Sequence, residues 1–281
     1  MTAPSNPVAV ATTFLFVPAT RPERFGRAHA SGAGIVIVDL EDAVPPEARD
    51  TARAKLASAL DAMPTGERAR TLVRINALGT PWHAADVAAA RAWTGAGLAG
   101  IVLPKADAAE ALAALSSTLG ARAQIVPLIE SGAGLDTVDS LATAPGVTRL
   151  AFGHLDFMAD LGMACEGDEP ELLPARFALV RASHRAGLAP PIDGVTTDTQ
   201  DIARMAHDAA RSLRMGFGGK LCIHPDQIAP VRDAFRPGAG QLDWSRRVLE
   251  RAEQGHALFT LDGRMVDAPV IALARRVVAR A

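Results

Sequence analysis

Six charged side chains close or nearly close short apolar runs, and their types are those used in acid–base, metal and anion chemistry. They are Glu41, Arg74, Lys105, Glu130, Asp156 and Asp193, in the runs IVIVDLE (35–41), TLVRIN (71–76), GIVLPK (100–105), QIVPLIE (124–130), RLAFGHLD (149–156) and PPID (190–193). If these runs are parallel strands of one barrel, their C-terminal ends meet at the same face. We therefore expect the six side chains to surround one pocket.

Glu130 and Asp156 are the predicted metal ligands, since each ends an apolar run and the two runs follow one another in the chain. Mg²⁺ is commonly held by one or two protein carboxylates, with water and substrate oxygens in the remaining positions. The alternative is that Asp156 caps the helix of DFMADLG and that Glu130 is an ordinary rim charge. Because both carboxylates are expected at neighbouring strand ends, we predict that they bind Mg²⁺ together.

Arg74 is the predicted anion-binding residue, because a guanidinium fork fits a carboxylate. The alternative is a structural ion pair with Asp39 or Glu41 on the adjacent strand. Asp39, Glu41 and Asp42 place three carboxylates within four residues, and like charges at this spacing repel. We expect one of them to bond Arg74 or Arg21 and another to accept a metal-bound water. Glu41 is a candidate general base.

Lys105 has two possible roles in a barrel, that of a Schiff-base nucleophile and that of a charge partner. A nucleophilic lysine needs a lowered pKa, whereas several carboxylates at the same mouth would raise the pKa of Lys105. We therefore expect charge pairing, and we place Lys105 with Arg21, Asp39 and Arg74 among the substrate-binding residues.

The elements that must position these side chains are eight apolar runs, the six above together with FLFVP (14–18) and GKLCIHP (219–225). Ala- and Leu-rich stretches with helical spacing separate them, as parallel strands require. This alternation predicts an α/β fold, a (β/α)8 TIM barrel over residues 1–237. A helical extension over 238–281, with helices near 243–255 and 268–280, is expected to close the barrel bottom or to reach a neighbouring subunit.

Composition excludes several classes of function. The 29 basic and 31 acidic residues give a formal charge of −2, which offers no support for nucleic-acid binding. The N-terminus lacks the basic region of a signal peptide, and no apolar run is long enough to span a membrane. With two cysteines and no zinc-like cluster, we expect a cytoplasmic protein that does not bind membranes.

Nine segments together carry a resemblance to a known family. They are LFVPATRPERF, VIVDLEDAV, VRIN, IVLPK, LIES, FGHLDFMADLG, PPIDG, GKLCIHPDQI and GRMVDAPV, spread over residues 14–270. In this order they resemble the citrate lyase β-subunit-like branch of the metal-dependent hydroxy-acid aldolase/citrate lyase superfamily.

The resemblance implies a (β/α)8 barrel assembled as a homotrimer or hexamer, with Mg²⁺ held by Glu130 and Asp156. It implies that Arg74 binds the oxo-acid part of the substrate, and that Asp267 of GRMVDAP reaches the active site of an adjacent subunit. Members of the family cleave or form the C–C bond of β-hydroxyacyl-CoA thioesters such as citryl-, malyl- or citramalyl-CoA.

The resulting hypothesis is a Mg²⁺-dependent lyase that yields acetyl-CoA and a 2-oxo acid. The metal is the Lewis acid, Arg74 holds the substrate carboxylate, and Glu41 or Asp267 moves the proton. Three alternatives stay open: an aldolase acting on free hydroxy-oxo acids, a malyl-CoA thioesterase, and a subunit of a carrier-protein-dependent lyase complex.

Overall fold

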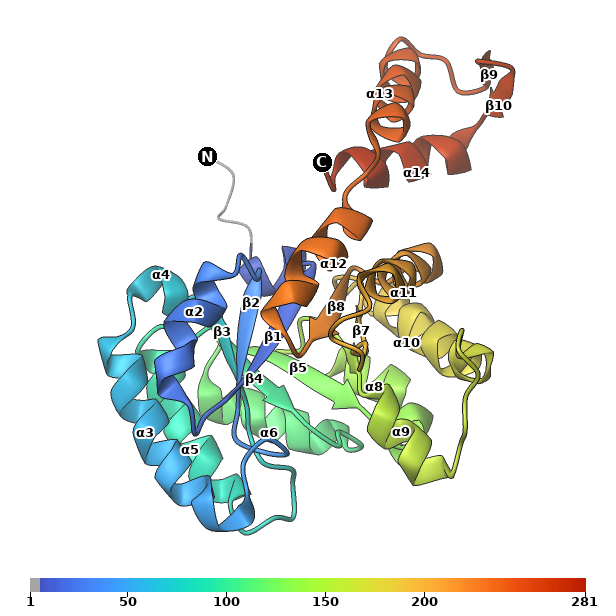
Figure 1. Cartoon of the computed structure of the whole chain (residues 1–281). Helices are drawn as coiled ribbons and strands as arrows, with labels where there is room; N and C mark the ends of the chain where they lie inside the picture. The colour runs from blue at the N-terminus through green and yellow to red at the C-terminus, as the bar shows by residue number, and fades with distance from the viewer. Residues whose placement is uncertain (1–5) are drawn as a thin grey trace. The chain divides into compact units, whose positions relative to one another are not determined.

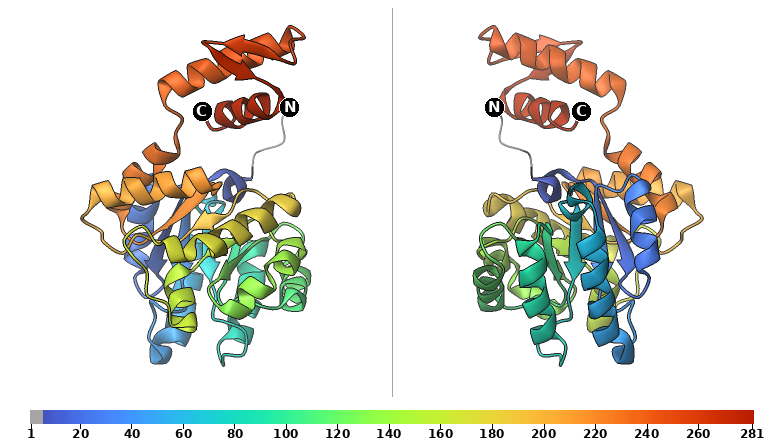
Figure 2. Two further views of the ribbon diagram at one scale, coloured as in Figure 1. Left: turned by 90° about the vertical axis from the view of Figure 1, so that its right-hand side faces the viewer. Right: turned by 90° about the vertical axis from the view of Figure 1, so that its left-hand side faces the viewer.

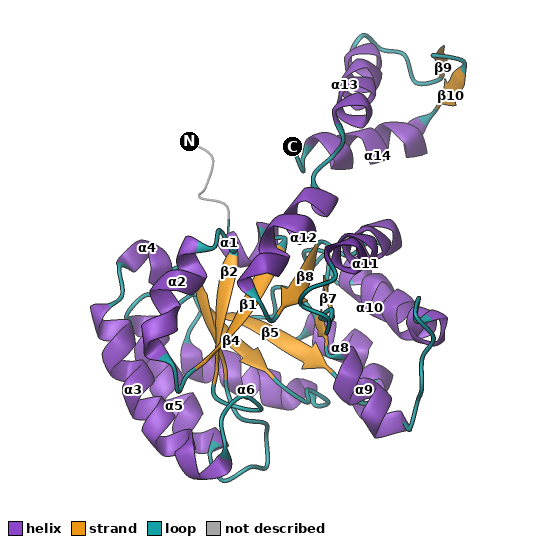
Figure 3. Cartoon of the chain, in the orientation of Figure 1, coloured by secondary structure: helices purple, strands orange, loops and turns teal. Residues whose placement is uncertain are grey.

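The computed structural model describes residues 6–281, and eight parallel strands form a closed barrel in it (Figures 1 and 3). Each strand pairs with the next along the chain, and β1 pairs with β8 to close the ring. The strands are β1 Thr13–Pro18, β2 Ile35–Asp39, β3 Thr71–Arg74, β4 Gly100–Leu103, β5 Gln124–Ile129, β6 Ala151–Phe152, β7 Ile192–Asp193 and β8 Gly219–Cys222. The predicted (β/α)8 fold is confirmed.

Helices surround this ring in Figure 3, and they follow the Ala- and Leu-rich stretches of the sequence. They are α1 Pro7–Val10, α2 Phe25–Ala30, α3 Arg49–Ala62, α4 Thr65–Arg68, α5 His83–Gly95, α6 Ala109–Leu119, α7 Gly132–Asp136, α8 Val138–Thr143, α9 His154–Leu161, α10 Leu173–Arg185, α11 Ile202–Met215 and α12 Ile228–Phe235. None of the helices in the part of the chain that the structure describes is long and apolar enough to cross a membrane.

Alternate residues of each strand fill the barrel interior, because successive side chains of a strand point to opposite faces. The interior row includes Ile35 and Ile37 of β2, Leu72 of β3 and Leu128 of β5. The positions two residues further on are Asp39, Arg74 and Glu130. The same alternation therefore delivers two acids and an arginine to the C-terminal mouth.

One glycine is required by close backbone approach at the start of a strand. Gly100 opens β4 with φ of 158°, and a Cβ at this position would collide with the backbone of Gln124 on β5. Only glycine tolerates this contact, so the register between β4 and β5 depends on it.

The chain divides into two compact units, the first running to Val231 and the second covering Arg232–Ala281. The division falls within α12, six residues before the predicted boundary between residues 237 and 238. The second unit pairs α13 Ala239–Glu253 with α14 Ala268–Val278 and contains a hairpin of β9 Phe259–Leu261 and β10 Arg264–Val266 (Figure 2). It has an apolar core of its own, which includes Val248, Val266 and Ala274.

Candidate active site

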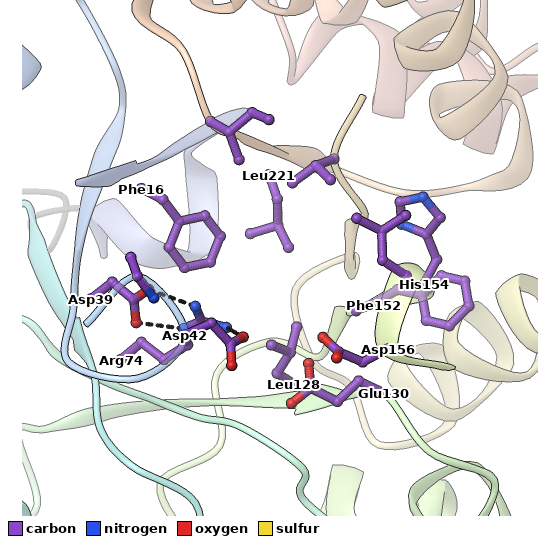
Figure 4. A pocket seen from close by; sticks show the side chains of 15 residues that line it. Phe16, Asp39, Asp42, Arg74, Leu128, Glu130, Phe152, His154, Asp156 and Leu221 are labelled. Carbon is purple, nitrogen blue, oxygen red and sulfur yellow. Dashed lines mark hydrogen bonds and ion pairs between the residues drawn. The ribbon is translucent and has the colours of Figure 1, made fainter. Parts of the chain in front are cut away.

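A cavity of about 370 Å³ opens at the C-terminal mouth of the barrel (Figure 4). Its charged and polar lining consists of Asp39, Asp42, Arg74, Glu130, His154 and Asp156. Its apolar lining includes Phe16, Leu128, Phe152, Val195 and Leu221. Predicted metal-binding and anion-binding side chains thus share one cavity.

Glu130 presents one free oxygen to this cavity. Its Oε1 accepts a hydrogen bond of 2.7 Å from the backbone N–H of Lys105. Its Oε2 is buried and has no hydrogen-bond partner among the described residues. The room for Oε2 exists because residue 153 is glycine, since a Cβ there would lie 2.5 Å from this oxygen.

The electrostatics of Glu130 favour a cation beside it. Burial, together with the carboxylates of Glu41 and Asp156, raises the pKa of Glu130 to about 8 against the opposing effect of Lys105. A nearby positive charge stabilises the ionised form of a buried carboxylate whose pKa is raised in this way. The open oxygen therefore lies where a bound cation would be stabilised.

Asp156 lies on the first turn of α9, after β6 has ended at Phe152. It was expected at the strand end itself. The alternative role as helix cap is not what the structure shows, because Gly153 occupies the N-cap position. Figure 4 shows the carboxylates of Asp156 and Glu130 near one another in the cavity lining.

Two carboxylates and an unpartnered oxygen fit Mg²⁺, which commonly takes one or two protein carboxylates. Within residues 6–281 no three His, Cys, Asp or Glu side chains are grouped so that they could hold a metal. A site that relies on three or more protein ligands, as zinc sites do, is therefore not formed by the described residues.

Arg74 forms the ion pair with Asp39 that was the alternative to substrate contact, and it also lines the cavity. Its Nε and Nη2 donate to the two oxygens of Asp39 at 2.7 and 2.6 Å, and its Nη1 lies 3.0 Å from Asp42. Burial alone would lower the pKa of Arg74, but the carboxylates of Asp39, Glu41 and Asp42 outweigh it and raise the pKa. The guanidinium stays charged and lines the cavity while stacking on Phe16, 4.9 Å from the ring centre.

Asp39 supports Arg74 and has little capacity left for a substrate. Besides the two bonds from Arg74, its oxygens accept from the backbone N–H groups of Glu41 and Ala43, both at 3.0 Å. It is 1% exposed. The predicted substrate contact at Asp39 is not what this geometry favours, since all four bonds are internal.

Lys105 pairs with Glu41, as expected from the surrounding acids. Its Nζ lies 2.7 Å from Oε1 of Glu41 and 4.0 Å from Oε1 of Glu130. Burial lowers the pKa of Lys105, but the hydrogen bond to Glu41 and the charges of Glu41, Glu130 and Asp42 together outweigh burial and raise it, which argues against a Schiff-base role. Neither Lys105 nor Glu41 lines the cavity.

Three further predicted residues are not among those that line the cavity. Arg21 is exposed and pairs with Glu23. Asp267 belongs to the second unit, where it caps α14 by accepting from the N–H of Val270 at 3.2 Å. Asp193 was expected in the pocket, which is wrong: it is fully buried behind β7 and bonded to Arg176 and Ser212, because its neighbour Ile192 takes the inward position.

Comparison with known proteins decides the family. Residues 12–225 match the family model described as HpcH/HpaI aldolase/citrate lyase. The chain belongs to this family.

Among the family's proteins, a citrate lyase subunit beta-like protein of Mycobacterium tuberculosis (strain H37Rv) is 35% identical over 274 residues, covering 95% of this chain and 94% of that protein. The L-malyl-CoA/beta-methylmalyl-CoA lyase of Cereibacter sphaeroides is 29% identical over 309 residues, covering 99% and 96%. A crystal structure of CitE from M. tuberculosis with magnesium, acetoacetate and coenzyme A superposes with a TM-score of 0.83 at 33% identity, covering 97% of this chain and 99% of that one. This membership identifies the protein as a lyase.

His154 lines the cavity of this lyase, although it was not among the predicted site residues. It is the first residue of α9 and is 3% exposed, and burial lowers its pKa to about 4, so the ring is neutral at pH 7. Gly194 lies against the ring so closely that a Cβ there would collide with Nδ1. The sequence feature that could have indicated His154 is its position on α9, half a helical turn before the predicted ligand Asp156. Phe16 was also missed, although it lies two residues after the inward-facing Phe14.

Proposed function

We propose that this chain is a Mg²⁺-dependent carbon–carbon lyase that cleaves or forms 3-hydroxyacyl-CoA thioesters of the citryl, malyl or citramalyl type. The products of cleavage would be acetyl-CoA and a 2-oxo acid. The observation that carries the proposal is the single cavity that holds Glu130, Asp156 and Arg74. Support comes from relatives named as malyl-CoA lyase and from a structural neighbour that binds magnesium and coenzyme A.

Glu130, through Oε2, and Asp156 are the residues that would hold Mg²⁺. When bound, Mg²⁺ supplies Lewis acidity, which lowers the pKa of a hydroxyl and stabilises charge on oxygen. The remainder of the site orients the substrate.

Arg74 would bind the carboxylate of the oxo-acid part. Asp39 holds Nε and Nη2 and thereby fixes the plane of the guanidinium. Nη1 faces Asp42, whose side chain is 53% exposed and so can yield its place to a substrate carboxylate. Binding through a preoriented guanidinium fixes the bond to be cleaved.

The cleavage step needs one base and one proton donor. The base removes the proton of the 3-hydroxyl, the C2–C3 bond breaks as the carbonyl of the 2-oxo acid forms, and the electron pair moves to the thioester enolate. A proton added to the enolate carbon gives the acetyl thioester.

Asp267 is the proton-transfer residue that we propose, provided by an adjacent subunit of a homotrimer or hexamer. Glu41 is the weaker candidate, because its Oε1 is bonded to Lys105, its Oε2 lies 3.1 Å from Arg74, and it does not line the cavity. The carboxylate of Asp267 accepts one hydrogen bond within the chain, from Val270.

Product analysis tests the proposed reaction. Purified protein is supplied with citryl-CoA, malyl-CoA and citramalyl-CoA in Mg²⁺ and in EDTA, and the products are separated. We expect acetyl-CoA and a 2-oxo acid from at least one thioester, in Mg²⁺ alone. Release of free CoA together with malate would indicate a thioesterase. Cleavage of free hydroxy-oxo acids, with no cleavage of the thioesters, would indicate an aldolase. Turnover that requires an added carrier protein would indicate a subunit of a lyase complex.

A further inference from the structure

Lys105 has an unusual backbone conformation at the edge of the site. It follows β4 and has φ of 49°, in the left-handed region that side-chain-bearing residues rarely adopt. Among residues 6–281, Glu169 and Asp262 are the other non-glycine residues with positive φ. Such a conformation persists where the surrounding contacts require it, and these are often functional contacts.

The turn at Lys105 directs two donors of one residue at two buried glutamates. The backbone N–H bonds Oε1 of Glu130 at 2.7 Å, and the ammonium bonds Oε1 of Glu41 at 2.7 Å. The Oε2 atoms of both glutamates are buried without a hydrogen bond among the described residues. One residue therefore determines which oxygen of each glutamate stays available.

The two available oxygens have different surroundings. Oε2 of Glu130 borders the cavity beside Gly153, whereas Oε2 of Glu41 lies 3.1 Å from Nη1 of Arg74. Glu41 is 4% exposed and is enclosed between two cations. If the ammonium were absent, Glu41 would keep only Arg74 as a partner and could turn toward the positive charge of a metal.

We propose that Lys105 is a positioning residue that keeps Glu41 out of the coordination sphere of the cation, so that Glu130 and Asp156 alone provide its carboxylates. Coordination positions then stay open for the hydroxyl and carboxylate of a substrate. This inference rests on the proposed Mg²⁺-dependent function and adds the device that limits the protein ligands of the metal.

The Lys105→Met substitution keeps the length of the side chain and removes its charge. Two effects then strengthen the binding of Mg²⁺ in the absence of substrate: a repelling cation is lost, and Glu41 becomes free to bind. We expect the dissociation constant of Mg²⁺ to fall by about tenfold, the lower end of what changes beside metal ligands produce. Turnover should fall at the same time, because Glu41 occupies a position that the substrate needs.

Calorimetric titration with MgCl₂ in the absence of substrate measures the first effect, and kcat at saturating Mg²⁺ measures the second. Lys55→Met is the matched control, since Lys55 is exposed on α3 and the chemical change is the same. Its Mg²⁺ affinity and kcat should equal those of the unmodified protein. Lys105→Arg keeps the cation and should not tighten Mg²⁺ binding.

A double substitution identifies Glu41 as the added ligand. Lys105→Met with Glu41→Gln should lose the part of the gain in Mg²⁺ affinity that Glu41 provides, so the fall in affinity caused by Glu41→Gln should be larger in Lys105→Met than in the unmodified protein, whereas independent effects would add. If Lys105→Met does not fold, the Mg²⁺ affinities of Glu41→Gln and Glu130→Gln provide the test. Glu41→Gln should weaken Mg²⁺ binding far less than Glu130→Gln does.

The inference is overturned if Lys105→Met binds Mg²⁺ no more tightly than the unmodified protein, or if Glu41→Gln weakens binding as much as Glu130→Gln. Both results leave the proposed function intact when the unmodified protein cleaves thioesters in Mg²⁺ and not in EDTA. Absence of that activity in the unmodified protein counts against the function itself.

Discussion

The orientation of the Glu130 carboxylate depends on the residue that faces it, Gly153, as much as on the position of Glu130 in the barrel. Gly153 leaves the space into which Oε2 projects, and no helix or strand pattern in the sequence marks such a contact. Glu130 and Arg74 could be predicted as site residues because they end apolar runs. The preference of Arg74 for Asp39 could only be left open, because the sequence does not tell which of three neighbouring acids faces the guanidinium.

Gly153→Ala tests this contact. The added Cβ would lie 2.5 Å from Oε2 and 2.7 Å from Cβ of Glu130, so the side chain of Glu130 must move. We expect Mg²⁺ affinity to fall by about tenfold or more, and the free energy of unfolding to fall by about 1–3 kcal/mol from overpacking. Calorimetry and urea denaturation measure the two quantities.

Gly26→Ala on α2 is the control for that experiment, since nothing lies within 4 Å of a Cβ at Gly26. It should keep Mg²⁺ affinity unchanged and should not destabilise the protein. Equal Mg²⁺ affinity in Gly153→Ala and the unmodified protein would show that Glu130 does not need this space.

At the scale of strands and helices, periodicity predicts which segments are strands but not which face each side chain takes. Parallel strands are apolar on both faces, so a run such as PPID carries no inside–outside alternation. A shift of one residue reverses the face, and this is why Asp193 lies behind the barrel and not in the pocket. Glu130, in a longer run with a clear inward row, was placed correctly at the mouth.

Asp193 instead joins β7 to the helices packed on it, and this gives a pH-dependent stability. Burial would raise the pKa of Asp193, but Lys220, Arg176 and Ser212 outweigh it and lower the pKa to about 2. Between the ordinary value of 3.8 and about 2, the unfolded chain binds a proton that the folded chain does not. The contribution of ionised Asp193 to the free energy of unfolding is therefore fully present above about pH 4, and it is lost as the pH falls from about 4 to about 2.

The Asp193→Asn variant should lose this contribution at all pH values. We expect a loss of about 2 kcal/mol or more at pH 7, because Arg176 also keeps a buried charge without its partner. Urea denaturation of both proteins from pH 7 to pH 2 measures the difference, which should shrink as the pH approaches 2. A difference that stays constant over that range would contradict the assigned charge of Asp193.

At the scale of the whole molecule, the sequence located the C-terminal helices within a few residues but missed the hairpin between them. The signal for the hairpin was present: Asp262 and Gly263 have φ of 51° and 74°, as an Asp-Gly turn between two short strands requires. The strands, at three residues each, are too short for alternation to be visible. Sequence alone does not indicate where this unit lies in an assembly.

Asp267 provides the test at this scale. Asp267→Asn preserves the cap of α14, because asparagine caps helices as well as aspartate does, and removes the charge. We expect kcat to fall by about a hundredfold, within the usual contribution of a general acid or base, with Mg²⁺ affinity unchanged.

Co-expression of Asp267→Asn with Glu130→Ala distinguishes action in an adjacent subunit from action within one chain. Mixed homotrimers would contain some sites with both residues intact, so activity should return to a measurable fraction of that of the unmodified protein. Recovery would be absent if each chain used its own Asp267. Light scattering on the purified proteins establishes whether the assembly is a trimer or hexamer.

The most direct measurement is calorimetric titration of Mg²⁺ into Glu130→Ala and Asp156→Ala, with Asp61→Ala as an exposed control on α3. The account predicts that both cavity variants lose Mg²⁺ binding and Mg²⁺-dependent thioester cleavage while remaining folded, and that the Asp61 variant keeps both. Mg²⁺ binding at unchanged affinity in either cavity variant would contradict the shared metal site on which the proposed lyase chemistry depends.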